Sequence, residues 1–173
     1  MPIYHFEVMR RRPGPARDLV SQLRLYSKQF MAHVETSDSE MMVEVSKKAW
    51  ETMVSLFNFL RNEQDAGRLS ATYMSTETAI LAKKLNIAER DAMLQNKKLD
   101  RRHQNFSAIS LREALNKIAH HDPAHSTYRI ARRAHYLILS GPDQNPRNGP
   151  WLAEIHITKL CNSCDIAIRS VQN

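Results

Sequence analysis

The chain has very few cysteines and no long apolar run. Its only two cysteines in 173 residues, Cys161 and Cys164, stand three residues apart, so a bond between them would constrain almost none of the chain. This excludes a disulfide-rich secreted scaffold and favours a reducing compartment. The opening sequence MPIYHFEVMRRR lacks the apolar stretch of a secretory signal, and no segment approaches the roughly 18 apolar residues that suggest a membrane span. We therefore expect a cytoplasmic protein with no membrane association.

The composition is that of an ordinary globular domain. Hydrophobic residues make up 42% of the chain and charged residues 25%, unlike the composition of disordered chains. A chain of this length usually folds as one domain around one core. No repeat, low-complexity segment or shift in composition marks a boundary, so we expect a single domain over residues 1–173.

Positive charge is concentrated in one segment. The net charge is +7, and residues 101–135 hold seven Arg and Lys residues against two acidic residues, together with five of the eight histidines. Such a segment is typical of proteins that bind polyanions such as nucleic acid. Solvated surface charge is the alternative, both here and for the short run Arg10–Arg12 with Arg17.

Most of the chain follows a helical pattern. Apolar residues recur at helical spacing over residues 15–34, 36–67 and 71–85. Asn86 and Ser110 are each followed three residues later by glutamate, the spacing of a capping box. They predict the starts of two further helices, over about 87–99 and 111–121.

The C-terminal third has a different pattern. Strand-forming runs at residues 136–139 and 151–158 flank the turn-forming loop GPDQNPRNGP, which predicts a β-hairpin. A short strand is expected at residues 3–9, and a final helix carries both cysteines toward the core. The predicted fold is mainly α, a helical bundle of about five helices with a small C-terminal β-hairpin.

A strip of three polar residues on the helix after Ser110 carries candidate chemistry. Arg112, Asn116 and His120 follow at i, i+4 and i+8, about 40° apart per step and off the apolar face. Arginine binds phosphate through its fork, histidine exchanges protons near neutral pH, and asparagine orients a partner. These groups suffice to cleave RNA without a metal or cofactor. A polar helix face with an unrelated Arg and His is the alternative.

The segment Arg112-Glu-Ala-Leu-Asn116-Lys-Ile-Ala-His120, late in a mostly helical chain, resembles the HEPN superfamily of helical-bundle proteins. Its members often carry an Arg, a spacer of four to six residues and a His on one late helix. The resemblance implies a dimeric, metal-independent endoribonuclease of the toxin or phage-defence type, with a protein antitoxin or partner subunit. It implies Arg112 and His120 as the catalytic pair, with Asn116 as a helper.

The spacer between Arg112 and His120 departs from the family pattern. It has seven residues, although His120 still falls on the Arg112 stripe. Arg129 and His135 match the family spacing but stand where we expect a turn or strand. Six further residues are expected to contact RNA: Lys97, Lys98, Arg101, Arg102, Lys117 and His121.

Two other functions remain open. Residues 75–99 resemble a helix-turn-helix, which would make the chain a non-catalytic nucleic-acid-binding or regulatory protein, although a plain helical hairpin fits the same pattern. The chain could also be an interaction subunit whose partner reads the Arg112 stripe.

A metal site has weaker support in the sequence. His156, Cys161 and Cys164 offer three metal ligands, but structural zinc takes four. Two cysteines facing the core are the simpler interpretation, so we expect no metal site.

Overall fold

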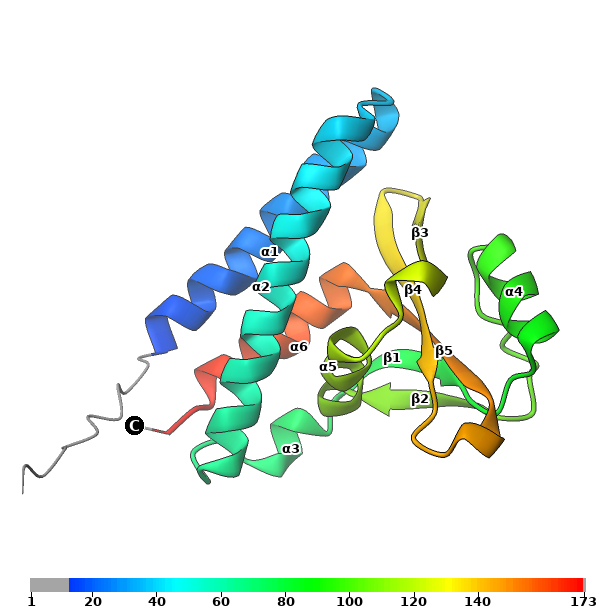
Figure 1. Cartoon of the computed structure of the whole chain (residues 1–173). Coiled ribbons are helices and arrows are strands. Elements are labelled where there is room, and N and C mark those ends of the chain that lie inside the picture. The colour runs from blue at the N-terminus through cyan, green and yellow to red at the C-terminus, as the bar shows by residue number, and fades with distance from the viewer. Residues whose placement is uncertain (1–12, 173) are drawn as a thin grey trace, which may run out of the picture.

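The computed structural model describes residues 13–172. The strand expected at residues 3–9 and the arginines at positions 10–12 lie outside this range. The described chain begins with two long helices, α1 (Pro13–Glu35) and α2 (Ser39–Asp65), which lie side by side as a helical hairpin (Figure 1). Both helices predicted over residues 15–34 and 36–67 are confirmed.

Both ends of α2 are closed by local hydrogen bonds. The Asp38 side chain accepts a hydrogen bond from the Met41 amide at the start, as an N-cap residue should. At the other end the amides of Gly67 and Arg68 donate to carbonyls of the last turn, and Gly67 has a positive φ of 73°. This is the C-terminal arrangement that favours glycine, and it explains why Gly67 marks the end of the helix in the sequence.

The second half of the molecule is built on a five-stranded sheet. Its strands are β1 (Glu77–Ala82), β2 (Phe106–Ser110), β3 (Ser126–Ala131), β4 (Ala134–Pro142) and β5 (Pro150–His156). They lie in the order β2-β1-β5-β4-β3, and every neighbouring pair is antiparallel. The protein is therefore an α+β fold, and the prediction of a mainly α bundle with a small hairpin is wrong.

The helix predicted over residues 71–85 is the principal error in the element assignment. Only a single turn, α3 (Ala71–Met74), is helical, and β1 follows it. Thr78, Ala79, Leu81 and Ala82 are all buried, so the strand lacks the alternation of apolar and polar residues that marks a half-exposed strand. Because the expected first helix is a strand, residues 75–99 do not form a helix-turn-helix or a helical hairpin.

The β4–β5 hairpin is present but lies within the sheet. Leu139 pairs with Ala153 across the two strands, and β5 also pairs with β1. The strand predicted over 151–158 ends at His156, and Thr158 already belongs to the last helix, α6 (Ile157–Arg169). As expected, Cys161 and Cys164 face the core and are fully buried. Burial raises the pKa of the Cys161 thiol to about 11.

The two predicted capping sites both start helices. Asn86 and Glu89 form a reciprocal capping box at the start of α4 (Ile87–Gln95), and the Ser110 side chain accepts a hydrogen bond from the Glu113 amide at the start of α5 (Leu111–Ala119). Both helices end earlier than predicted, α4 at Gln95 rather than near 99 and α5 at Ala119 rather than 121.

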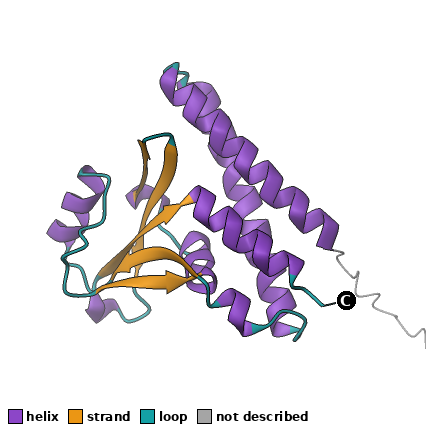
Figure 2. Cartoon of the chain, turned by 180° about the vertical axis from the view of Figure 1, so that it is seen from behind, coloured by secondary structure: helices purple, strands orange, loops and turns teal. Residues whose placement is uncertain are grey.

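Helices cover both faces of the sheet (Figures 1 and 2). Helices α1, α2, α5 and α6 pack on one face around the larger cluster of buried residues, while α4 packs on the other over a smaller cluster. The segment after α4 is tied down by buried Glu154, which accepts hydrogen bonds from the Leu99 amide at 3.1 Å and from Arg129 at 2.9 Å. Within residues 13–172, no helix has the length and apolar character needed to cross a membrane.

The loop before β5 generates a stability prediction. Gly149 has φ 68° and ψ −174°, a conformation almost confined to glycine, and a Cβ there would lie 2.2 Å from the Leu85 carbonyl oxygen. Gly149→Ala should therefore lower the free energy of unfolding by at least about 3 kcal/mol. Gly67→Ala is the matched control, because φ is also positive but nothing lies within 4 Å of the added Cβ, so its cost should be about 1 kcal/mol. Urea unfolding of both variants measures the difference, and equal losses would contradict it.

Candidate functional site

Helix α5 is held between the sheet and α2. Its buried residues are those of the apolar face expected from the sequence: Leu111, Ala114, Leu115 and Ile118. Arg112, Asn116 and His120 are off this face, and each is at least partly exposed. The structure therefore confirms a solvent-accessible polar stripe, which here lies along the neighbouring helix α2.

Arg112 is held at the C-terminal end of α2. Its guanidinium donates a hydrogen bond to the Gln64 side chain and lies 4.0 Å from an Asp65 carboxylate oxygen. Arg61 lies 3.6 Å from the other oxygen of the same carboxylate. Two arginines thus share one acidic partner, which leaves a positive charge available to an anion.

A shallow depression of about 280 Å³ lies beside this charge cluster. Its lining residues come from α2, α3 and the first turns of α5: Phe57, Arg61, Met74, Ser110, Arg112, Glu113, Leu115 and Asn116. Glu113 lies 3.3 Å from Lys83, so its negative charge has a partner of its own. The depression therefore presents two arginines, an asparagine amide and an aromatic ring.

His120 completes the stripe at the end of α5. It is the C-cap residue, with φ −120°, and its ring meets that of Phe57 edge to face at 6.4 Å between centroids. Eight residues of helix separate the Arg112 and His120 backbones by about 12 Å, with Asn116 midway. The two side chains can thus reach a phosphate from opposite sides if it lies over Asn116.

His121 points away from the stripe, because one residue of helix is about 100° of rotation. Its ring stacks on Trp50 at 4.2 Å, and its Nδ1 lies 2.8 Å from the Ile118 carbonyl oxygen. A carbonyl oxygen only accepts hydrogen bonds, so Nδ1 is the ring nitrogen that carries the hydrogen in this contact. His121 therefore belongs to a different surface from His120.

The other expected RNA contacts lie apart from the stripe. Lys117 packs over the Trp151 ring at 4.4 Å, and burial lowers the pKa of its amine. The remaining four contacts follow α4, on the opposite face of the sheet: Lys97, Lys98, Arg101 and Arg102. All four are exposed, and none forms an ion pair with another described residue. They form a second basic surface rather than an extension of the Arg112 stripe.

Arg129 and His135, the pair with the family spacing, do not form a site. They lie on β3 and β4, where a turn or strand was expected, but they face opposite sides of the sheet. Arg129 donates to buried Glu154 and lies over the Tyr136 ring. His135 is 8% exposed on the side of α1, and its Nδ1 lies 3.0 Å from the Ser27 hydroxyl.

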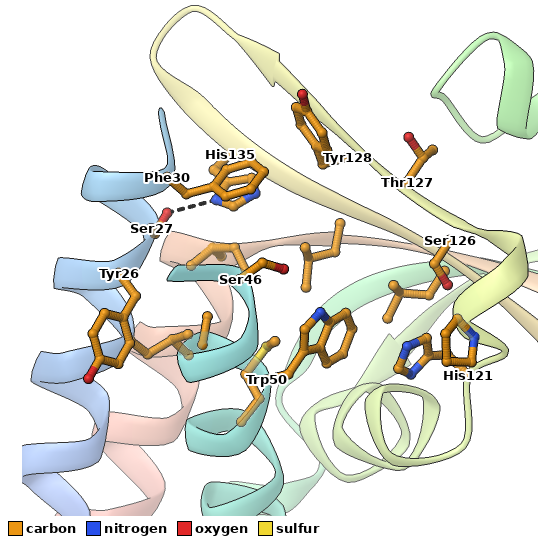
Figure 3. A pocket seen from close by; sticks show the side chains of 17 residues that line it. Tyr26, Ser27, Phe30, Ser46, Trp50, His121, Ser126, Thr127, Tyr128 and His135 are labelled. Atoms are coloured by element: carbon orange, nitrogen blue, oxygen red, sulfur yellow. Dashed lines mark hydrogen bonds between the residues drawn. The ribbon is translucent and has the colours of Figure 1, made fainter. Parts of the chain in front are cut away.

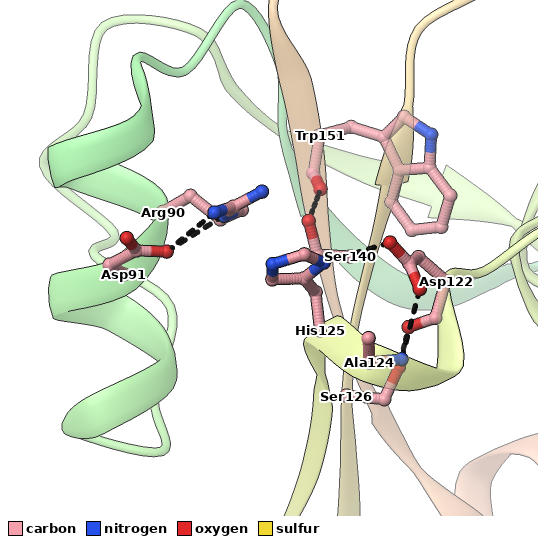
Figure 4. A network of polar contacts seen from close by, with 8 residues as sticks. All are labelled: Arg90, Asp91, Asp122, Ala124, His125, Ser126, Ser140 and Trp151. Carbon is pink, nitrogen blue, oxygen red and sulfur yellow. Dashed lines mark hydrogen bonds and ion pairs between the residues drawn. The ribbon is translucent and has the colours of Figure 1, made fainter.

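A carboxylate–imidazole pair that was not predicted from the sequence lies next to the end of α5. The Asp122 carboxylate lies 2.8 Å from His125 Nδ1 and also accepts from the Ala124 amide, capping the short helix η1 (Pro123–His125) (Figure 4). The His125 hydrogen bond is the main cause that lowers the Asp122 pKa. The Asp-Pro-x-His spacing in the sequence is a local signal of this pair.

The Asp122 carboxylate orients the His125 imidazole, as the mechanism of a general base requires. Within residues 13–172, however, no serine hydroxyl is hydrogen-bonded to this ring. In Figure 4 the Arg90 side chain reaches from α4 toward His125, while Arg90 itself pairs with Asp91 at 2.8 Å. The nearby Ser140 hydroxyl donates to the Trp151 carbonyl at 2.7 Å. A serine triad needs that hydroxyl on the histidine, so the geometry disfavours one.

The three proposed metal ligands are not assembled for metal binding. His156 stacks on Tyr136 with ring centroids 4.8 Å apart, whereas Cys161 and Cys164 lie on the buried side of α6. In the part of the chain that the structure describes, no three His, Cys, Asp or Glu side chains come together in a way that could hold a metal ion.

The buried His135 generates a pH prediction. Burial, with a smaller contribution from His156, lowers the His135 pKa from 6.5 to about 4. Because the folded pKa lies below the unfolded value, the unfolded chain binds the proton more tightly. This contribution to stability is complete above pH 6.5 and is lost as the pH falls toward 4. Its full size is about 3 kcal/mol.

Urea unfolding of the wild type and of His135→Phe, at about pH 7 and pH 4.5, measures this effect. We expect the wild type to lose the larger share of its stability at low pH, by roughly 2 kcal/mol more than the variant. Equal losses in the two proteins would contradict the assignment.

Comparisons of the chain with protein-family models, curated proteins and solved structures gave no match.

Proposed function

We propose that the protein is a metal-independent endoribonuclease whose reacting groups are Arg112, Asn116 and His120. The proposal rests on one observation: the three side chains share an accessible stripe of α5. Beside this stripe lies a depression in which two positive side chains, Arg61 and Arg112, have a single acidic partner, Asp65. An RNA phosphate is the anion that fits such a site, and Phe57 lines the depression next to it.

The reaction follows from the chemistry of these groups. The ribose 2′-hydroxyl attacks the adjacent phosphorus, the bond from phosphorus to the 5′-oxygen breaks, and the products are a 2′,3′-cyclic phosphate and a 5′-hydroxyl. Either His120 accepts the proton from the 2′-hydroxyl and water protonates the leaving 5′-oxygen, or His120 protonates the leaving oxygen and water takes the 2′-hydroxyl proton. Arg112 stabilises the charge on the phosphate, and Asn116 orients it. No metal takes part.

The fold differs from the helical bundle that the HEPN resemblance implies, because the second half of the chain is built on a five-stranded sheet. The proposal therefore depends on α5 and its contacts with α2 rather than on the architecture of that family. Glu113, which follows Arg112 directly, is engaged with Lys83 and leaves the stripe positive. We extend the proposal to a homodimer that joins two such stripes, and to a toxin or defence role with a protein antitoxin, as the resemblance implies.

A second candidate function is nucleic-acid binding without catalysis. It is favoured by the basic surface that follows α4, where Lys98, Arg101 and Arg102 line one open depression. This function no longer involves a helix-turn-helix. Its signature is a salt-dependent affinity that falls when these cations are removed.

RNA cleavage in EDTA tests the proposal. Wild type, Arg112→Ala and His120→Ala are incubated with total RNA and tRNA, and the products are analysed for 2′,3′-cyclic phosphate ends. We expect each variant to lose at least about 100-fold in rate, the usual size of a general acid–base or phosphate-stabilising contribution. Both side chains are exposed, so the variants should keep their stability to within about 0.5 kcal/mol.

Two control variants make the assay specific. Arg133→Ala removes an exposed arginine from the β3–β4 turn, and His125→Ala removes another accessible histidine near the end of α5; both should retain wild-type cleavage. Loss of cleavage in His125→Ala but not in His120→Ala would place the chemistry at the Asp122 pair instead. If the wild type does not cleave, and removal of Lys98, Arg101 and Arg102 weakens RNA binding, the second candidate holds.

A further inference from the structure

A cavity of about 220 Å³ lies between the helical hairpin and the sheet, away from the Arg112 stripe (Figure 3). Its walls come from α1, α2, the start of β3 and the middle of β4, with His121 at one side. The floor is apolar and includes Leu23, Met53 and Leu139. Three serines also line it, Ser27, Ser46 and Ser126.

Two stacked pairs of rings stand on opposite sides of this cavity (Figure 3). Phe30 stacks on His135 with centroids 5.0 Å apart and planes 4° apart, and Trp50 stacks on His121 at 4.2 Å and 12°. Tyr128 adds a third wall, edge to face with Phe30 at 4.8 Å. Flat π faces on several sides favour a flat ligand, because aromatic rings associate by offset stacking or edge-to-face contact.

One residue of the cavity wall, His135, carries an unsatisfied polar atom. His135 is 8% exposed, and its Nδ1 is engaged with the Ser27 hydroxyl. Its Nε2 is the one buried side-chain nitrogen or oxygen within residues 13–172 that has no hydrogen-bond partner. A buried nitrogen without a partner is unfavourable and rare in native proteins. A ligand atom that pairs with it accounts for its presence.

The charge state of His135 restricts the ligand further. Burial keeps the imidazole neutral at physiological pH, and the charged or titratable side chains near it are those of Tyr128 and His156. With no fixed charge at this point, the nitrogen offers a single neutral hydrogen bond. An uncharged ring with a polar edge suits it better than a phosphate or a carboxylate.

The volume limits the size of the ligand. A buried apolar cavity of about 150 Å³ holds benzene, whereas drug-sized ligands take roughly 300–1,000 Å³. A cavity of about 220 Å³ therefore suits a ring system somewhat larger than benzene, such as one heterocycle of one or two rings.

We propose that this cavity binds one nucleobase, with its ring between the Phe30–His135 and Trp50–His121 stacks and its polar edge on His135 Nε2. The base can belong to a free nucleoside or to a nucleotide of single-stranded RNA, because both present the same ring. The proposal does not require RNA cleavage, so it stands or falls independently of the nuclease.

Calorimetric titration of the full chain with adenosine, guanosine, cytidine and uridine tests the proposal, with hexanoate as an alkyl probe of similar size. We expect at least one nucleoside to bind with a dissociation constant below about 1 mM, and hexanoate not to bind. His135→Phe keeps the ring and removes both nitrogens, and it should weaken binding about tenfold, the value of one hydrogen bond. Trp50→Leu should weaken it further, while Tyr73→Leu, an exposed aromatic outside the cavity, should have no effect.

Competition with a short single-stranded RNA distinguishes the two sources of the base. Displacement of the nucleoside by RNA identifies a nucleotide of RNA as the ligand, and its absence identifies a free nucleoside; either result supports the proposal. No nucleoside binding to the folded wild type would overturn it, as would binding of hexanoate alone. Nucleoside affinity unchanged in both His135→Phe and Trp50→Leu would place the base elsewhere and would also overturn it.

Discussion

The central strands of the sheet are buried on both faces, and the arrangement of the other elements follows from this constraint. Leu81, Leu139 and Ala153 are inaccessible on the face covered by α1, α2, α5 and α6. On the α4 face, adjacent residues of the same strands are equally inaccessible: Ala82 on β1, Ile138 on β4 and Leu152 on β5. Apolar surface of this extent on both sides must be covered to be stable in water, so helices flank the sheet on both sides. The helical hairpin and α4 are therefore separated by the sheet, and the two basic surfaces of the molecule are separated with them.

The candidate site is a consequence of where α5 begins. Ser110 is both the last residue of β2 and the N-cap of α5, so no loop separates the strand from the helix. The rotation of α5 about its own axis is therefore fixed, with Leu111 and Leu115 buried. That rotation directs Arg112 toward the end of α2. At the other end of α5 two consecutive residues face different surfaces: His120 lies beside Phe57, and His121 stacks on Trp50. A single short helix thus contributes to an exposed cationic stripe and to the wall of an aromatic cavity.

Local signals in the sequence predicted local structure well, whereas pairing between distant segments was not predictable from it. The long helices, both capped helix starts and the β4–β5 hairpin depend on contacts within a few residues. Strand β1 was taken for a helix because its buried residues do not alternate with polar ones. The polar stripe on α5 was identified correctly from its spacing. The aromatic cavity was missed because it brings together residues such as Ser27 and His135, which are 108 positions apart, and no local pattern marks such a pair. The Asp122–His125 pair did have a local signal, a carboxylate and an imidazole three residues apart.

The central claim is that Arg112 and His120 bind the same phosphate, although about 12 Å of helix separates their backbones. The most direct test is an NMR titration with uridine 3′-monophosphate, following the Arg112 guanidinium Nε–H signal and the ring signals of His120 and His125. We expect the Arg112 and His120 signals to move together with one dissociation constant, and the His120 response to disappear in Arg112→Ala. Movement of only one of the two signals, or a His120 response that persists without Arg112, would contradict the claim.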